Sequence, residues 1–321
     1  MADRTSIEWT DATWNVVNGC SVTSPGCKHC YAMKQAHRVE ARRGLTEKTA
    51  GGMVWTGEVR FNEKVLEQPL RWKKPRRIFV CAHGDLFHES VPDEWIDRVF
   101  AVMALCPQHT FQVLTKRSAR MREYFEKHRD AGGPCKSMAI IWDQAIEIAT
   151  EHGCVPQYRP SLETLPNVWL GVSVEDQTRA DERIPDLLAT PAAVRFLSCE
   201  PLLAPVDLAL LHHDGITNID ALRGTHGVVG MSGDCAAIDW VIVGGESGPK
   251  ARPMHPDWAR SLRDQCAAAG VPFLFKQWGE WAPCESENGT ALPGEFPAMR
   301  VGKKRAGRLL DGVQHDGFPH A

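Results

Sequence analysis

Largely apolar runs of four to seven residues recur along the chain, and most are followed by a polar turn and a segment with helical spacing. The runs lie at 14–17, 77–82, 110–114, 167–173, 193–198, 240–243 and 271–275. Helical spacing follows at 31–43, 93–104, 118–128, 177–188 and 257–269, and Gly270 stands where the last of these helices would end. Strands that alternate with helices are typical of a parallel sheet with right-handed crossovers.

The runs are apolar at nearly every position, as expected where both faces of a sheet are buried. They predict an α/β fold, a partial or near-complete (β/α) TIM-like barrel of about 6–7 parallel strands. Residues 1–281 are assigned to this barrel, with insertions near 130–166 and 208–239, and residues 282–321 to a polar, loosely packed C-terminal tail. An open doubly wound sheet is the alternative, although the chain has neither Gly-x-Gly-x-x-Gly after the first strand nor a Walker loop.

Polar side chains gather where the predicted strands end. In a parallel barrel these positions share one face, the face on which active sites are built. The polar residues concerned are Asp85, Lys116, Ser173, Glu175, Glu200, Glu246 and Lys276. We therefore expect a functional site at this face.

Three cysteines, Cys20, Cys27 and Cys30, follow the first predicted strand directly. A structural zinc site normally has four ligands, for which His29 or His37 would have to complete the set. Three thiolates without an obvious fourth ligand are typical of a [4Fe–4S] cluster with one open iron, which is the interpretation we favour.

The composition narrows the class of protein and its expected cellular location. The apolar fraction of 43% and the charged fraction of 24% are ordinary for a globular protein. No apolar run approaches the ~20 residues of a membrane span, and the N-terminus lacks the pattern of a signal peptide. We therefore expect a cytoplasmic protein with reduced thiols and no membrane partner.

The net charge is −3, but basic clusters at 34–43, 71–77 and 300–308 are compatible with a phosphate-bearing partner.

Five motifs stand out along the chain: the cysteine loop, Gly84-Asp-Leu-Phe87, Leu114-Thr-Lys-Arg117, Ser198-Cys-Glu-Pro201 and Gly244-Gly-Glu-Ser247. Together they resemble the radical S-adenosylmethionine superfamily, in particular a phage-associated three-Cys-motif family that is distantly similar to spore photoproduct lyase. The resemblance covers about residues 5–280. The superfamily usually shows Cys-x-x-x-Cys-x-x-Cys, whereas six residues separate Cys20 from Cys27 here.

The resemblance implies an enzyme in which Cys20, Cys27 and Cys30 hold a [4Fe–4S] cluster. The open iron would chelate S-adenosyl-L-methionine, and an electron from a donor such as flavodoxin or ferredoxin would release a 5′-deoxyadenosyl radical. This radical would act on a nucleic acid or nucleotide, as repair or modification. The cofactor carries the difficult chemistry, and the protein positions it.

Further residues acquire roles by the same resemblance. Gly84 and Asp85 would contact the methionine amino group, Ser173 and Glu175 the ribose, and Arg183 the methionine carboxylate. Lys116 would hold an anion, and Cys199, beside Glu200, would return a hydrogen atom to the product; these three are the catalytic candidates. Plainer roles stay open: Asp85 as a turn cap, Arg183 as surface charge and Cys199 as a buried apolar residue.

Two other functions remain open from the residues alone. The first is a nucleic-acid-binding module in which zinc stabilises the cysteine loop. The second is a metal-dependent hydrolase that binds a cation through Asp85, Glu200 and Glu246.

Overall fold

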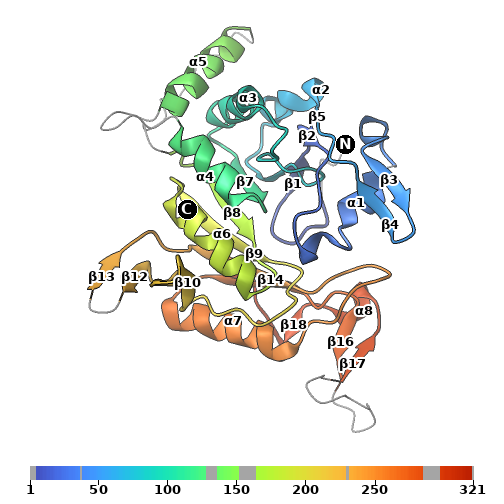
Figure 1. Ribbon diagram of the computed structural model, residues 1–321. Coiled ribbons are helices and arrows are strands. Elements are labelled where there is room, and N and C mark those ends of the chain that lie inside the picture. Colours follow the sequence, from blue (N-terminus) through green and yellow to red (C-terminus); the bar gives the residue numbers. More distant parts are fainter. Residues whose placement is uncertain are drawn as a thin grey trace. The chain divides into compact units, whose positions relative to one another are not determined.

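Seven parallel strands form the centre of the fold, in the order β1-β6-β7-β8-β9-β14-β15. The computed structural model describes residues 5–36, 38–127, 136–151, 164–228, 231–284 and 297–319 (Figure 1). The predicted α/β class, with about six to seven parallel strands, is confirmed. The strands are β1 (Ala12–Trp14), β6 (Arg77–Val80), β7 (Thr110–Thr115), β8 (Val168–Ser173), β9 (Val194–Cys199), β14 (Trp240–Gly244) and β15 (Phe273–Gln277).

The chain divides into two compact units that interleave along the sequence. Unit 1 comprises Met1–Thr23, Ala32–Val172 and Ala189–Arg195, and unit 2 comprises Ser24–Tyr31, Ser173–Leu188 and Phe196–Ala321. The cysteine loop therefore contributes Cys20 to unit 1 and both Cys27 and Cys30 to unit 2.

Unit 1 contains parallel pairs of β1 with β6, β6 with β7, and β7 with β8. All six residues of β8 are buried, as expected for a strand covered on both faces. Helix α3 packs against α5. The other elements that lie mainly here are α1 (Tyr31–Ala36), β2 (Val17–Asn18), β3 (Thr46–Thr49), β4 (Gly52–Trp55), β5 (Arg60–Phe61), α2 (Glu63–Leu66), α3 (Asp93–Ala104), α4 (Ser118–Glu126) and α5 (Lys136–Glu151).

Unit 2 contains β9, β14 and β15, paired in parallel, with α7 (Pro256–Ala269, orange in Figure 1) packed on β14 and β15. His255 caps α7 by accepting the N–H of Asp257, and Gly270 ends it at φ +71°, a left-handed value that suits glycine. The second insertion folds into its own antiparallel sheet. The other elements are α6 (Gln177–Ala189), β10 (Leu211–His213), β11 (Thr217–Asp220), β12 (Thr225–Val228), β13 (Met231–Asp234), β16 (Trp281–Pro283), β17 (Ala298–Arg300), α8 (Lys303–Ala306), β18 (Leu309–Leu310) and β19 (Val313–Gln314).

Two local expectations differ from the structure. The strand expected at 14–17 is split into β1 and β2, and β2 pairs antiparallel with β5 instead of joining the parallel strands. The helix expected from Tyr31 to Arg43 ends at Ala36, because Val39 adopts an extended conformation before a short 3₁₀ turn at Glu40–Arg42.

The C-terminal segment is more ordered than its composition indicates. Phe275 donates its N–H to the carbonyl of His315, and Gly317 donates to the carbonyl of Phe273, so this segment lines the outer edge of β15. The indole N–H of Trp240 also donates to the carbonyl of Gly317, at 2.7 Å. An exposed strand edge carries unpaired backbone groups, and here the end of the chain satisfies them. The expectation of a loosely packed tail is wrong for residues 297–319.

None of the helices in the described ranges is both long and apolar enough to cross a membrane.

Candidate functional site

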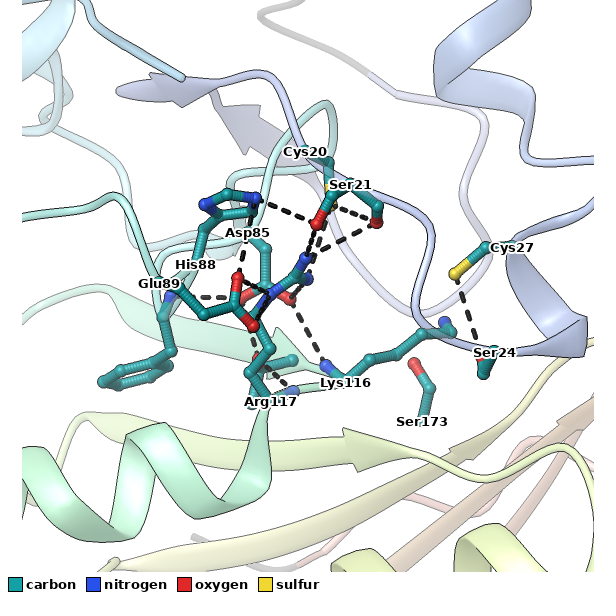
Figure 2. A network of polar contacts seen from close by, with 12 residues as sticks. Cys20, Ser21, Ser24, Cys27, Asp85, His88, Glu89, Lys116, Arg117 and Ser173 are labelled. Atoms are coloured by element: carbon teal, nitrogen blue, oxygen red, sulfur yellow. Dashed lines mark hydrogen bonds and ion pairs between the residues drawn. The ribbon is translucent and has the colours of Figure 1, made fainter. Parts of the chain in front are cut away.

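Arg117, which follows β7, lies beside Cys20 in unit 1. Its Nη1 donates to Cys20 Sγ at 3.4 Å and to Asp85 Oδ2 at 3.0 Å. Its Nη2 donates to the carbonyl and hydroxyl oxygens of Ser21, and its Nε donates to the Glu89 carboxylate. All five guanidinium N–H groups are thus engaged, and the side chain is only 4% exposed. Arg117 holds Cys20 at the carboxyl end of β7 (Figure 2).

Asp85, beyond the end of β6, fixes the position of Arg117. Its Oδ1 accepts hydrogen bonds from the Phe87 N–H and the Thr115 hydroxyl, and its Oδ2 accepts from the Lys116 N–H and from Arg117. A carboxylate offers about four acceptor positions, so these donors occupy Asp85 fully. The structure therefore gives Asp85 a turn-capping and arginine-orienting role, and the predicted contact with a methionine amino group would have to displace one of these donors.

Gly84 lies where its own backbone closely approaches the backbone of residues 17–19. A Cβ on Gly84 would lie 2.6 Å from the carbonyl oxygen of Val17, so no larger residue fits there without a shift. Gly84 also forms an isolated parallel bridge with Gly19, directly before Cys20. The glycine therefore lets the β6 end and the start of the cysteine loop pack together.

Ser21 and His88 complete the surroundings of Arg117. The Ser90 N–H donates to Nδ1 of His88, so the ring proton is on Nε2, which donates to the Ser21 hydroxyl at 3.1 Å. Burial, followed by the Arg117 charge, lowers the pKa of His88, which favours the neutral ring. Sequence reasoning missed Ser21, His88 and Glu89, because none of them follows a strand directly.

In unit 2, Glu175 holds the turn that carries Cys27. The Gly26 N–H donates to Glu175 Oε1 at 3.2 Å, and Arg183 Nη1 donates to Glu175 Oε2 at 3.0 Å. Arg183 also donates to the carbonyl of Ser173, at 2.8 Å. The Glu175 and Arg183 side chains are 1% and 2% exposed, so the surface-charge alternative for Arg183 is wrong.

A second arginine–carboxylate pair holds the same turn. Glu246, after β14, accepts three hydrogen bonds from Arg252, which also donates to the carbonyl of Pro25 at 3.0 Å. Burial opposes ionisation of Glu246, but the Arg252 hydrogen bonds and charge outweigh it and lower the pKa of this carboxyl. Arg252 was missed from the sequence, since it stands in a Gly/Pro-rich loop without periodicity.

Glu200 forms a third paired carboxylate, at the end of β9. Lys276 Nζ donates to Glu200 Oε2 at 2.7 Å, and Gln277 Nε2 donates to Oε1 at 2.9 Å. A Cβ on Gly244 would come within 3.3 Å of the Glu200 carboxyl carbon, so this glycine makes room for the pair. Glu200 and Glu246 follow the ends of β9 and β14, and Lys276 is the penultimate residue of β15.

Two predicted residues have polar groups that remain available. In the part of the chain that the structure describes, the Lys116 ammonium and the Ser173 hydroxyl have no hydrogen-bond or ion-pair partner. Lys116 is half-buried after β7, and Ser173 is buried at the end of β8. Each of these groups could engage a ligand without breaking an existing contact.

Cys199 is placed in the core, with no exposed surface. Burial raises its thiol pKa well above the ordinary range, and Cys266 of α7 is the second cause. The plainer role, a small buried apolar residue, fits this environment, and the hydrogen-atom donor stays a prediction.

The cysteine loop itself has thiols of mixed exposure. Cys27 is buried, with its Sγ 3.8 Å from the Ser24 hydroxyl, whereas Cys20 and Cys30 are half-buried. Within residues 5–36, 38–127, 136–151, 164–228, 231–284 and 297–319, no group of three His, Cys, Asp or Glu side chains forms a ready-made metal site. His37, one of the alternative fourth ligands, lies outside the described residues.

Comparison with known proteins places the chain in a family. Residues 4–319 match the family described as "Protein of unknown function (DUF5131)". The chain belongs to this family. The match spans both units and includes the cysteine loop and every paired carboxylate described above. Neither the curated proteins nor the solved structures contain a match to the chain.

Proposed function

We propose that this DUF5131 member is a radical S-adenosylmethionine enzyme that binds a [4Fe–4S] cluster through Cys20, Cys27 and Cys30. The observation that carries the proposal is the hydrogen bond from Arg117 to Cys20, because an N–H donor directed at sulfur stabilises a metal-bound thiolate. Soft thiolate donors suit iron, and three of them leave one iron open.

Hydrogen bonds that hold the cysteine loop support the proposal. Arg117 fixes Cys20, while Glu175 and Arg252 fix the backbone on the N-terminal side of Cys27 through Gly26 and Pro25. Ligand loops held by buried hydrogen bonds lose less freedom when a cofactor binds. When bound, the reduced cluster would supply one electron that cleaves the sulfonium and yields 5′-deoxyadenosyl radical and methionine.

The chain's own residues then have separable tasks. Lys116 has an ammonium without a partner among the described residues, which could bind a carboxylate or phosphate, and Ser173 has a hydroxyl that could bind a ribose. Glu175 and Arg183 support the loop through their mutual pair, and Asp85 supports Arg117. The substrate class that we propose is a nucleic acid or nucleotide, which is supported by the exposed basic residues Lys303, Lys304 and Arg305 of α8.

The hydrolase alternative fits the geometry less well. Asp85, Glu200 and Glu246 are each already paired with a cationic side chain, namely Arg117, Lys276 and Arg252. A carboxylate that is neutralised by a hydrogen-bonded cation is a poor ligand for a divalent metal, because binding would first break the pair.

Anaerobic purification with iron and sulfide analysis tests the proposal. A brown protein with about four iron and four sulfide ions per chain is expected. The reduced protein should then convert S-adenosylmethionine to 5′-deoxyadenosine, and a matching nucleic acid or nucleotide should increase the rate. A colourless protein that carries one zinc ion would overturn the proposal in favour of a zinc-stabilised module.

A further inference from the structure

The contact between Arg117 and Cys20 is more constrained than a surface hydrogen bond. Each N–H of the guanidinium has its own acceptor, and one of the Nη1 hydrogens is directed at Cys20 Sγ. The Cys20 thiol itself lies 3.4 Å from the carbonyl oxygen of Ser21, which Arg117 also contacts. With a side chain only 4% exposed, Arg117 has little freedom to turn away from the sulfur.

We infer that Arg117 is a positioning residue that sets the reduction potential of the cluster through its hydrogen bond to Cys20. This inference rests on the proposed function. A hydrogen bond from a cation withdraws negative charge from a ligating sulfur, so it stabilises the reduced cluster more than the oxidised one and raises the potential. A donor held by five contacts keeps this effect constant, whereas a mobile surface lysine would not.

Glu89 modulates the same hydrogen bond from Arg117 to Cys20. It accepts from Arg117 Nε at 2.9 Å, and its side chain is 62% exposed, so its charge opposes that of the guanidinium without being needed in the core. Burial opposes ionisation of Glu89, but the hydrogen bond from its own backbone N–H, followed by the hydrogen bonds and charge of Arg117, outweighs burial and lowers the pKa, so the carboxylate is ionised at neutral pH. Removing this charge leaves Arg117 a stronger donor to Cys20.

The test uses two variants of the full-length, cluster-loaded protein, each with a matched control from unit 1. Arg117→Lys keeps the charge but loses the planar fork that reaches Cys20 and Asp85 together. Its control is Arg98→Lys, because Arg98 forms a comparable fork with Glu63, at 2.7 Å for each oxygen. Glu89→Gln is paired with Glu63→Gln, since both glutamates are 62% exposed and bonded to an arginine.

The experiment measures the midpoint potential of the cluster by spectroelectrochemical titration. It also records the electron paramagnetic resonance spectrum of the reduced cluster and determines the iron content of each variant. We expect Arg117→Lys to shift the potential to more negative values and Glu89→Gln to shift it to more positive values, with full iron content and no shift in either control. In the Arg117→Lys background, the effect of Glu89→Gln should shrink.

Unchanged potentials in both iron-loaded variants would overturn the inference and leave the proposed function standing. Where Arg117→Lys fails to fold or to load iron, Glu89→Gln decides: a positive shift beyond that of Glu63→Gln supports the inference, and an equal potential overturns it. A wild-type chain that binds no iron overturns the proposed function instead.

Discussion

The backbone N–H of Gly26 donates a hydrogen bond to Oε1 of Glu175, a residue 149 positions further along the chain. This contact joins the turn that precedes Cys27 to the end of β8. It also links the turn to a buried ion pair, because Glu175 Oε2 binds Arg183. The ion pair and the turn are therefore expected to respond together when either is changed.

Glu175→Ala should destabilise the fold by about 3–5 kcal/mol, because it leaves the Arg183 guanidinium buried without a counter-charge. Urea unfolding at pH 7 measures the change. Glu182→Ala serves as the control, since Glu182 pairs with Arg179 on the same helix but is 55% exposed, and its loss should cost about 0–1 kcal/mol. Equal losses in the two variants would contradict the role given to Glu175.

Gly26→Ala should cost about 1–3 kcal/mol, because a Cβ there would lie 3.1 Å from the carboxyl group of Glu175, which Arg183 holds in place. The control is Gly51→Ala, whose Cβ would meet only Thr49 Oγ1 at an ordinary 3.7 Å. In a Glu175→Ala background, Gly26→Ala should cost less, and strictly additive losses would show that the two residues do not interact.

Cys27→Ala should abolish both iron binding and the formation of 5′-deoxyadenosine, since the proposed cluster then has two thiolate ligands. Iron analysis and chromatography of the reaction products check this. Cys266→Ala is the control, because it removes another buried thiol, on α7, without touching the loop. If 5′-deoxyadenosine still formed in Cys27→Ala, the assignment of the loop would be wrong.

Asp311→Asn should lower stability at pH 7 by about 0.5–1 kcal/mol, a modest amount because the carboxylate is partly exposed. Asp311 accepts hydrogen bonds from Arg260 and Arg263 of α7, which lower its pKa to about 2. A depressed folded-state pKa gives stability that is present above the ordinary value of 3.8 and is lost as the pH falls towards 2. The wild type and Asp311→Asn should therefore converge in urea unfolding near pH 2. Asparagine tolerates the left-handed backbone at φ +54°, so the turn itself is kept.

Iodoacetamide should leave Cys199 and Cys266 unmodified in the native protein at pH 8 and modify both after unfolding. Only the thiolate reacts, and burial raises the pKa of Cys266 to about 12 and that of Cys199 still further. Mass spectrometry of peptides measures the labelling, with half-buried Cys235 as the reactive control. Rapid native labelling of Cys199 would show that its surroundings open, which a hydrogen-atom donor requires.

Much of the fold could be predicted from local sequence patterns. Helix α3 has the predicted bounds, and α7 ends at the predicted glycine, because apolar spacing and terminal residues act over a few positions. The split of the first strand could not be predicted from local patterns, because it depends on the pairing of β2 with β5, more than forty residues away.

The candidate site was predicted in its positions but not in its partners. Asp85, Glu200 and Glu246 were found because they follow strands, and that rule says nothing of which side chain meets which. Arg117 and Cys20 are 97 residues apart, and Arg252 and Pro25 are 227 apart. Such contacts depend on the order of the strands and on the course of the loops, which a single sequence does not reveal.

The separation between Pro25 and Arg252 also has a consequence for the order of events during synthesis. The turn before Cys27 is synthesised first, and the arginine that binds it follows 227 residues later. At ~5–20 residues per second, this interval lasts on the order of ten to fifty seconds. During that time the nascent thiols have only part of their final surroundings, so we expect the proposed cluster to be loaded after Arg252 has been synthesised rather than before.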